Sequence, residues 1–391
     1  MITLETADKA LKSVYLEVVG NQLNISANPL LTKIKQTTNN VYGNEIRKAT
    51  SFGASGGFTA AGEQDELPTA VGTNYTQFVS KLKNLYGTLE ISDKALRCSQ
   101  NSAGAFVNLL NAEMEALIKS SSFNLGRMLY SNGMGIIARI NESNEVGVMD
   151  LHVDSTRYLI DNMMIRIINK SNSGYSPDLP FKITHINRTT NTITVDRETD
   201  RDMVDFGIST VKGYKNELTG IEALFDDMVN VIYGISKKAY PWMKSYHQKD
   251  VGAISESAIQ KAIDSVEFES ESEVDFIACS AGVRRAFQEE MSSFKRNIDV
   301  MNLQGGFKAI SYNGIPLVSD RFAENGAMYL LSTKNFELCQ LCDWQWIEDS
   351  EGKIIRQKAG YPIYTATLVK YAELMCGRPS LQVKSLILVP F

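Results

Sequence analysis

Residues 103–129 carry the stretch AGAFVNLLNAEMEALIKSSSFNLGRML, which contains no proline. Its apolar residues recur every three or four positions, the spacing of a helix with one buried stripe. They are Val107, Leu110, Met114, Leu117, Leu125 and Met128. A helix over the whole stretch would be about 40 Å long, and Gly133 and Gly135 follow as its stop. We expect a long rod whose stripe packs on the C-terminal strands, with Asn108, Asn111 and Glu115 on its other face.

Length and composition describe a folded protein without a strong charge preference. The 391 residues are enough for two or three domains, and 43% of them are hydrophobic. The net charge of −5 gives no global attraction to nucleic acid or to an anionic membrane. No apolar run is long enough to span a bilayer, and the first twenty residues lack the pattern of a signal peptide. We expect a protein of a cytoplasm-like compartment.

The chain has five cysteines, an odd number that argues against a disulfide framework. Cys339 and Cys342 form a C-x-x-C, but no second pair of ligands at matching spacing completes a zinc site. The pair lies in FELCQLCDWQW, a strand-like sequence. We therefore expect two small residues on one strand, no metal site and no cofactor.

The segments before residue 103 predict an arm and a hairpin. Residues 21–44 are rich in Asn and Thr and have few core residues, which suggests an arm that is ordered only by other parts of an assembly. Residues 45–52 and 76–92 are strand-like, although Lys81 and Lys83 share the parity of Val79 and Leu85. Between them, residues 53–75 contain five glycines and cannot form a core. Such a long loop is typically functional or disordered, and we expect the strands that carry it to project from the body.

After the long stretch, a β-rich block over residues 134–215 predicts a small barrel or sandwich. Residues 218–238 have helical periodicity, and residues 255–266 predict a helix with Ser255 as its N-cap. Asn313-Gly314 between apolar strands indicates a tight hairpin. Further strands are expected near residues 274–278, 327–331, 336–342, 361–374 and 381–389.

The search for catalytic motifs yields three weak candidates. Gly53-Ala54-Ser55-Gly56-Gly57 matches the G-x-S-x-G string of serine hydrolases, but more loop follows it where a helix is required. The acids Glu63, Asp65 and Glu66 lie in a polar loop, which favours a solvated or partner-facing charge run over paired catalytic acids. We expect no enzyme.

The third candidate is a basic run with aromatic residues between its lysines, a composition found on nucleic-acid surfaces. It comprises Lys237, Lys238, Lys244 and Lys249 with Tyr240, Trp242 and Tyr246, beside the isolated His247. Its charge density is low. We favour an ordinary surface beside a Pro-Trp packing corner.

The order of these parts resembles the major capsid proteins of tailed bacteriophages, the Hong Kong 97-type fold. The resemblance rests on Asn28-Pro29-Leu30-Leu31, on 56–58 through 66–68, and on Leu85-Tyr86-Gly87-Thr88-Leu89-Glu90-Ile91-Ser92. Gly104-Ala105-Phe106-Val107 with Glu113-Met114 also matches. So does Gly306-Phe307 through Asn313-Gly314-Ile315-Pro316-Leu317-Val318-Ser319-Asp320.

The resemblance implies an α+β fold in seven parts. They are an N-terminal arm (1–44), an extended loop hairpin (45–92), the spine helix of a peripheral domain (93–133), an inserted β-rich domain (134–215), a return to the peripheral domain (216–249), an axial domain (250–325), and C-terminal strands shared by the axial and peripheral domains (326–391). The inserted domain departs from the minimal fold.

The resemblance also implies a function. The chain would self-assemble through pentamers and hexamers into the icosahedral shell that encloses the double-stranded DNA of a tailed phage, assembled in the host bacterial cytoplasm. Its partners would be a portal protein, a separate scaffolding protein, a decoration protein and, non-specifically, the packaged DNA, with no membrane. The residues expected at inter-subunit contacts are Phe52, Gly56, Gly57, Phe58, Glu63, Glu66, Leu67 and Pro68.

Two alternatives remain, and two family features are not carried over. An encapsulin-like nanocompartment shell shares the fold, and a serine hydrolase using Gly53-Ser55-Gly57 is the remote alternative. We expect no fused scaffolding segment and no maturation cleavage within residues 1–44. The lysine–asparagine crosslink of the family has no lysine available in residues 53–75.

Overall fold

The computed structural model describes most of the chain after its first twenty residues. The described residues are Leu16, Val19, 22–26, 28–52, Phe58, Ala60, Gly62, Glu63, Glu66, Thr69, Gly72, 74–94, 103–143, 146–169, 179–269, 273–293, 300–303 and 306–388. Within these residues, no helix has both the length and the apolar character needed to cross a membrane.

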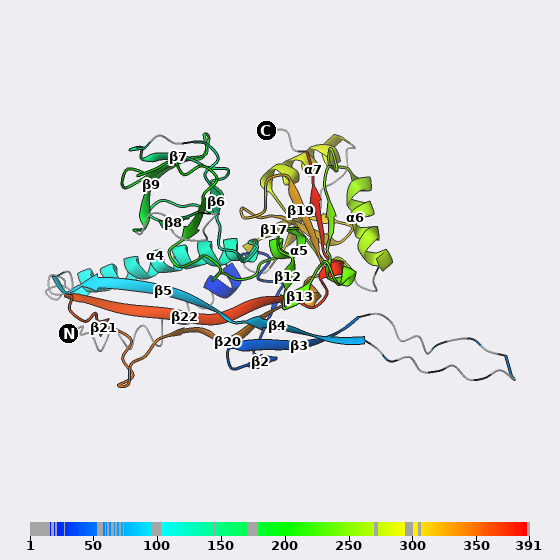
Figure 1. The fold of residues 1–391 in the computed structure, drawn as a ribbon, viewed down its shortest axis with the longest axis horizontal. Helices are drawn as coiled ribbons and strands as arrows, with labels where there is room; N and C mark the ends of the chain where they lie inside the picture. The colour runs from blue at the N-terminus through cyan, green and yellow to red at the C-terminus, as the bar shows by residue number, and fades with distance from the viewer. Residues whose placement is uncertain are drawn as a thin grey trace.

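The predicted long helix is confirmed as α4 (Ala103–Leu129), which lies along a five-stranded sheet (Figure 1). This sheet comprises β1 (Lys35–Thr37), β20 (Phe336–Trp346), β22 (Ile363–Cys376), β21 (Arg356–Gln357) and β5 (Lys83–Ser92). The apolar stripe of α4 was expected to pack on the C-terminal strands, but its direct contact is with β5. Leu117 packs against Gly87 of β5, where an added Cβ would lie 2.9 Å from Leu117 Cδ1. The C-terminal strand β22 lies one position further along the sheet, paired to β5.

The strand expected over residues 76–92 is two strands in two different sheets. β4 (Asn74–Lys81) belongs to a three-stranded sheet with β2 (Val41–Tyr42) and β3 (Glu45–Phe52), whereas β5 joins β22. The break falls at Leu82, whose N–H donates to Asn44 O at 3.0 Å. It explains the parity of Lys81, which lies on the face of β4 opposite the buried Phe78. Lys83 does share the buried face of β5 with Leu85, and its Nζ donates to Lys215 O at 3.0 Å.

The β-rich block forms a six-stranded sheet that lies apart from the other sheets, beyond α4 (Figure 1). Its strands, in spatial order, are β6 (Ala138–Arg139), β11 (Gly207–Thr210), β8 (Met164–Ile168), β9 (Phe181–Asn187), β10 (Thr192–Val195) and β7 (Asp150–His152). An isolated bridge joins Ile140, next to β6, to Val153, next to β7. Because β6 and β7 are the two end strands, this bridge closes the sheet into a small barrel, one of the two predicted forms.

A seven-stranded sheet forms the remaining body, with α6 (Glu256–Glu269) and α7 (Ala281–Ser293) beside it (Figure 1). Its strands, in spatial order, are β14 (Tyr246–Gln248), β23 (Val383–Leu386), β19 (Ala327–Leu331), β15 (Phe276–Cys279), β18 (Ile315–Ser319), β17 (Lys308–Tyr312) and β16 (Val300–Asn302). Ser255 Oγ accepts the N–H of Ala258 at 3.2 Å, which confirms the predicted N-cap. Asn313 (φ 48°) and Gly314 (φ 83°) form the predicted tight turn.

The helix expected over residues 218–238 is wrong. Only α5 (Glu222–Phe225) is helical there, and Asp226 is extended with ψ 115°. β12 (Val231–Ile232) and β13 (Ile235–Ser236) follow as a hairpin. Its turn residues Tyr233 (φ 51°) and Gly234 (φ 80°) both have positive φ, as a type I′ turn requires. Apolar spacing imitated a helix because several short elements each bury one to three residues.

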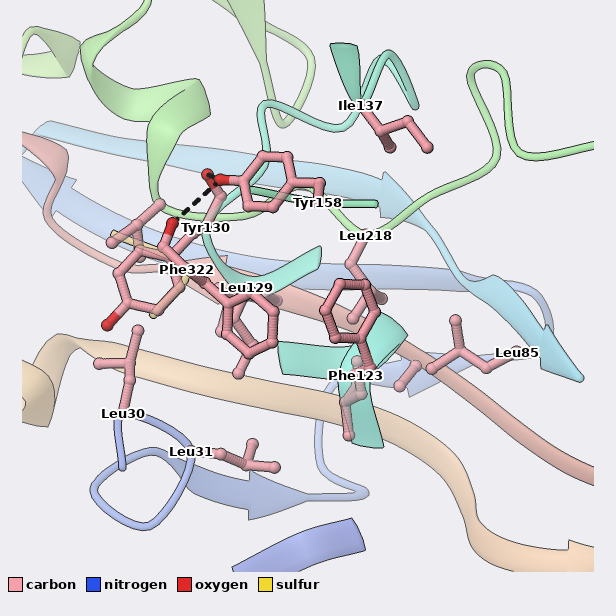
Figure 2. Packing of buried hydrophobic residues seen from close by; sticks show 14 of the residues in the cluster. Leu30, Leu31, Leu85, Phe123, Leu129, Tyr130, Ile137, Tyr158, Leu218 and Phe322 are labelled. Atoms are coloured by element: carbon pink, nitrogen blue, oxygen red, sulfur yellow. Dashed lines mark hydrogen bonds between the residues drawn. The ribbon is translucent and has the colours of Figure 1, made fainter. Parts of the chain in front are cut away.

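The expectation that the arm has little core is wrong for residues 28–37. Leu30, Leu31 and Ile34 are buried, and Figure 2 shows Leu30 and Leu31 in the core cluster. Strand β1 pairs with β20 in parallel. Asn28 Nδ2 donates to Asp320 Oδ2 at 2.8 Å, so this part of the arm belongs to the folded body of its own subunit.

Candidate functional site

The β3–β4 ribbon runs away from the six-stranded sheet and below the seven-stranded sheet (Figure 1). The two strands pair without a register shift from Glu45 opposite Lys81 to Phe52 opposite Asn74. Eight residues at about 3.3 Å each make a ribbon of roughly 25 Å. The ribbon leads into the loop at Phe52 and Asn74.

The base of the hairpin is held by an aromatic platform that sequence analysis missed. Phe78 of β4 is fully buried, with its ring centroid 5.5 Å from Tyr233 and 6.0 Å from Trp242. Phe52, at the end of β3, stacks on Trp242 at 4.9 Å. Val79 N–H donates to Tyr233 O at 3.0 Å. The hairpin is thus packed against the Tyr233-Gly234 turn and the Pro241-Trp242 corner.

Two polar contacts also hold the hairpin on the body of the subunit. Lys48 Nζ lies 2.9 Å from Glu337 Oε2 at the start of β20. Thr50 Oγ1 donates to Gly377 O at 3.1 Å, just after β22. Both contacts come from β3 and reach the five-stranded sheet, so this strand is fixed to the body before the chain enters the loop.

The loop residues expected at inter-subunit contacts are placed only in part. Phe58 has 96% of its surface exposed, and Glu63 and Glu66 are also exposed. Phe52 is half-buried by its own subunit's Trp242. Four of the expected contact residues lie outside the described residues: Gly56, Gly57, Leu67 and Pro68. The residues of the hydrolase string, Gly53, Ser55 and Gly57, also lie outside them.

The basic run at residues 237–249 is partly structural. Lys237 Nζ donates to Ala223 O at 2.6 Å and to Leu224 O and Asp226 O at 3.0 Å. Burial lowers the pKa of this ammonium below its ordinary value. Trp242 packs against the ring of Phe52. These two residues therefore act in packing, in agreement with the favoured interpretation of the run.

A second anchor ties the arm to the five-stranded sheet. Lys370 of β22 is completely buried. Its Nζ donates to Asn24 Oδ1 at 3.1 Å, to Gln36 Oε1 at 2.9 Å and to Asp343 Oδ1 at 2.9 Å. Burial lowers its pKa, whereas the bond to Asp343 raises it. A single ammonium thus joins two arm residues to β20, which sequence alone could not show.

The remaining candidate chemistry is weak in the described part of the chain. No group of three or more His, Cys, Asp or Glu side chains within it could hold a metal ion. Cys339 and Cys342 lie on β20 as predicted, and both are free thiols. Burial raises the pKa of the Cys339 thiol to about 11, which makes it a poor nucleophile at neutral pH.

Comparison with known proteins identifies the fold. No family model and no curated protein matches the chain. Among solved structures, its arrangement is that of tailed-phage capsid proteins, and the expected α+β fold of the Hong Kong 97 type is confirmed. The chain matches the capsid asymmetric unit of cyanophage A-1(L) with a TM-score of 0.52 and 9% identity, over 93% of this chain and 91% of that chain.

Two further solved structures match the chain with lower TM-scores. One is the capsid of a native GTA particle, with a TM-score of 0.48 and 10% identity over 92% of this chain and 90% of that chain. The other is the holo-SrpI encapsulin complex from Synechococcus elongatus PCC 7942, with a TM-score of 0.42 and 9% identity over 90% of this chain and 84% of that chain.

Proposed function

We propose that the chain is a major capsid protein, which self-assembles into the icosahedral shell around the packaged double-stranded DNA of a tailed phage. The observation that carries the proposal is the β3–β4 hairpin, which is fixed to the body as far as Phe52 and leads into a loop whose Phe58, Glu63 and Glu66 are exposed. A monomer gains nothing from such a loop, whereas a neighbouring copy can supply the missing contacts. The match to a phage capsid over 93% of the chain supports it.

The parts of the subunit receive roles under this proposal. Residues 1–44 are the arm, 45–92 the extended loop, 93–133 the spine-helix segment, and 134–215 the inserted domain. Residues 216–249 return to the peripheral domain, 250–325 form most of the axial domain, and 326–391 supply strands to both domains. The loop contacts comprise Phe52, Gly56, Gly57, Phe58, Glu63, Glu66, Leu67 and Pro68.

The proposed partners are copies of the same chain in pentamers and hexamers, a portal protein and a separate scaffolding protein. A decoration protein is a further partner, and packaged DNA touches the inner wall non-specifically. With a net charge of −5, the subunit offers DNA little overall attraction, so packaged DNA can slide along the wall. Assembly takes place in the host cytoplasm, and the shell protein has no enzymatic role.

Electron microscopy of the purified protein tests the proposal. We expect closed icosahedral particles after expression with its scaffolding partner, and a persistent monomer would contradict the proposal. Nuclease-protected DNA in native particles separates the phage shell from the nanocompartment alternative. Closed particles that enclose a protein cargo and no DNA would favour the encapsulin-like shell.

A further inference from the structure

Two arginines flank an aromatic cluster where the six-stranded sheet meets the turn after β18. Arg157 Cζ lies 4.4 Å from the ring centroid of Tyr158. Arg321 Cζ lies 4.9 Å from the ring of Phe123 and 5.3 Å from that of Phe322. The rings of Tyr158 and Phe322 are 6.5 Å apart, and Figure 2 shows them beside Phe123 of α4. The two guanidinium groups thus border one small patch.

A third arginine lies at the same junction. Arg188 follows β9 and is exposed. Its Nη1 donates to Thr156 O at 2.8 Å and its Nη2 to Leu159 O at 3.0 Å, on either side of Arg157 and Tyr158. Burial lowers the pKa of Arg321, and the positive charge of Arg188 lowers it further. We call Arg157, Arg188 and Arg321 the arginine cluster.

The cluster lacks carboxylate partners among the residues that the structure describes. None of the three guanidinium groups forms an ion pair there, and Arg157 Nε is buried without a hydrogen-bond partner from those residues. Asp320 is the adjacent acid, but its carboxylate is buried and accepts hydrogen bonds from Asn28 Nδ2 and Phe322 N–H. Three arginines beside a single buried carboxylate keep an excess of positive charge, which favours an anionic partner from outside.

The same chain carries a matching anion in its projecting loop. Residues 53–75 contain Glu63, Asp65 and Glu66 and no lysine or arginine. Glu63 and Glu66 are exposed. The β3–β4 hairpin that bears the loop points away from the six-stranded sheet of its own subunit (Figure 1). The arginine cluster that these acids can meet therefore belongs to another copy.

We propose that the arginine cluster of one subunit binds the acidic loop of a second copy of this chain. This inference rests on the proposed shell function and adds the surface that receives the loop. Guanidinium–carboxylate pairs supply both strength and geometric specificity. Repulsion between like charges would disfavour any wrong register between subunits.

Charge reversal tests the pairing. One variant carries Glu63→Arg and Glu66→Arg, a second carries Arg157→Glu and Arg321→Glu, and a third combines all four changes. Arg188 stays, because its hydrogen bonds to the carbonyl groups hold the local backbone. We expect each double variant to lose sedimenting shells and the combined variant to regain them. Arg201→Glu, on an exposed side chain already beside Asp200, is the matched control and should assemble like the parent.

The outcomes separate the hypotheses. Parental shell yield from both double variants overturns the pairing, and so does an arginine variant that assembles normally but loses only its DNA. A parental protein that never forms shells refutes the proposed function and this inference with it. If the arginine variant does not fold, Glu66→Cys with Arg321→Cys decides: oxidised shells should contain disulfide-linked oligomers, and their absence overturns the pairing.

Discussion

Arg127 and Glu217 form a bidentate pair, with Nη1 to Oε2 at 2.7 Å and Nη2 to Oε1 at 2.6 Å. Both side chains are 1% exposed. Arg127 lies in the last turn of α4, where a positive charge also interacts favourably with the helix dipole. Glu217 lies just after the six-stranded sheet. The pair therefore joins the two points where the chain leaves α4 for that sheet and where it returns.

We predict that Arg127→Met strongly destabilises the subunit. It leaves the Glu217 carboxylate buried without its partner, which costs about 3–5 kcal/mol in the free energy of unfolding. Urea unfolding of the unassembled subunit measures this loss. Arg127→Met with Glu217→Leu should recover most of it, because no charge then remains buried.

A matched control uses an exposed ion pair. Lys358 and Glu90 lie 3.2 Å apart and are each 48% exposed, so Lys358→Met should change the free energy of unfolding by about 1 kcal/mol at most. Equal effects of Arg127→Met and Lys358→Met would show that burial of the first pair has no energetic weight.

We also predict that Gly126→Ala destabilises the subunit, although alanine is the better helix former by about 1 kcal/mol. A Cβ on Gly126 would lie 2.4 Å from Phe322 Cε2. The Phe322 ring cannot move freely, because it packs on Phe123 at 5.3 Å and on Tyr158. Overpacking of this kind costs about 1–3 kcal/mol. Thermal unfolding should show a lower melting temperature, and Phe322→Leu in the same chain should restore part of it.

The elements that sequence predicted well are those decided by local chemistry. The uninterrupted periodicity of residues 103–129, the Ser255 cap and the Asn313-Gly314 turn each depend on neighbours in the chain. The general place of the projecting hairpin also followed from its glycine-rich loop. These features needed no knowledge of distant contacts.

The features that sequence missed depend on partners far along the chain. Lys370 carries no sign that it meets Asn24 and Asp343, 346 and 27 residues away. The helix expected over residues 218–238 failed because Phe78 of β4 packs against Tyr233, which fixes a hairpin turn there. The strand break at Leu82 was hidden because the two strands join different sheets. Tertiary contacts override local periodicity in each case.

The stability of the subunit should fall between about pH 4.5 and pH 7 through Glu373. This carboxyl group is completely buried in β22, and burial raises its pKa from 4.5 to about 7, against hydrogen bonds from Thr219 and Leu374 N–H. A raised carboxyl pKa means that the folded state binds the proton more tightly than the unfolded state. The contribution is therefore fully present below pH 4.5 and is lost as the pH rises through 7.

Glu373→Gln isolates this effect. Its amide keeps an acceptor for Thr219 N–H, which lies 2.7 Å from Glu373 Oε1, and carries no charge. We expect the free energy of unfolding of the variant, measured with urea, to exceed that of the parent by about 3 kcal/mol at pH 8. This difference should vanish near pH 4. A constant difference between the two proteins across this range would contradict the assignment to Glu373.

The loop of the β3–β4 hairpin should be needed for assembly and not for folding. Phe52 and Asn74 face each other at the end of the ribbon, so Asn-Gly in place of residues 53–73 can close it as a two-residue turn. The free energy of unfolding should not fall, because the shorter loop lowers the entropy cost of closure. The Phe78, Lys48 and Thr50 contacts at the base remain in this variant.

Assembly of the shortened variant should fail, because residues 53–73 carry the exposed Phe58, Glu63 and Glu66. Velocity sedimentation should then show capsomers or monomers where the parent gives shells. A Gly/Ser loop of the original length is the control for reach. If this Gly/Ser variant fails to assemble, the defect lies in the lost loop side chains. If it assembles, assembly requires only the length of the loop. Parental shell yield from the Asn-Gly variant would refute any role of the loop between subunits.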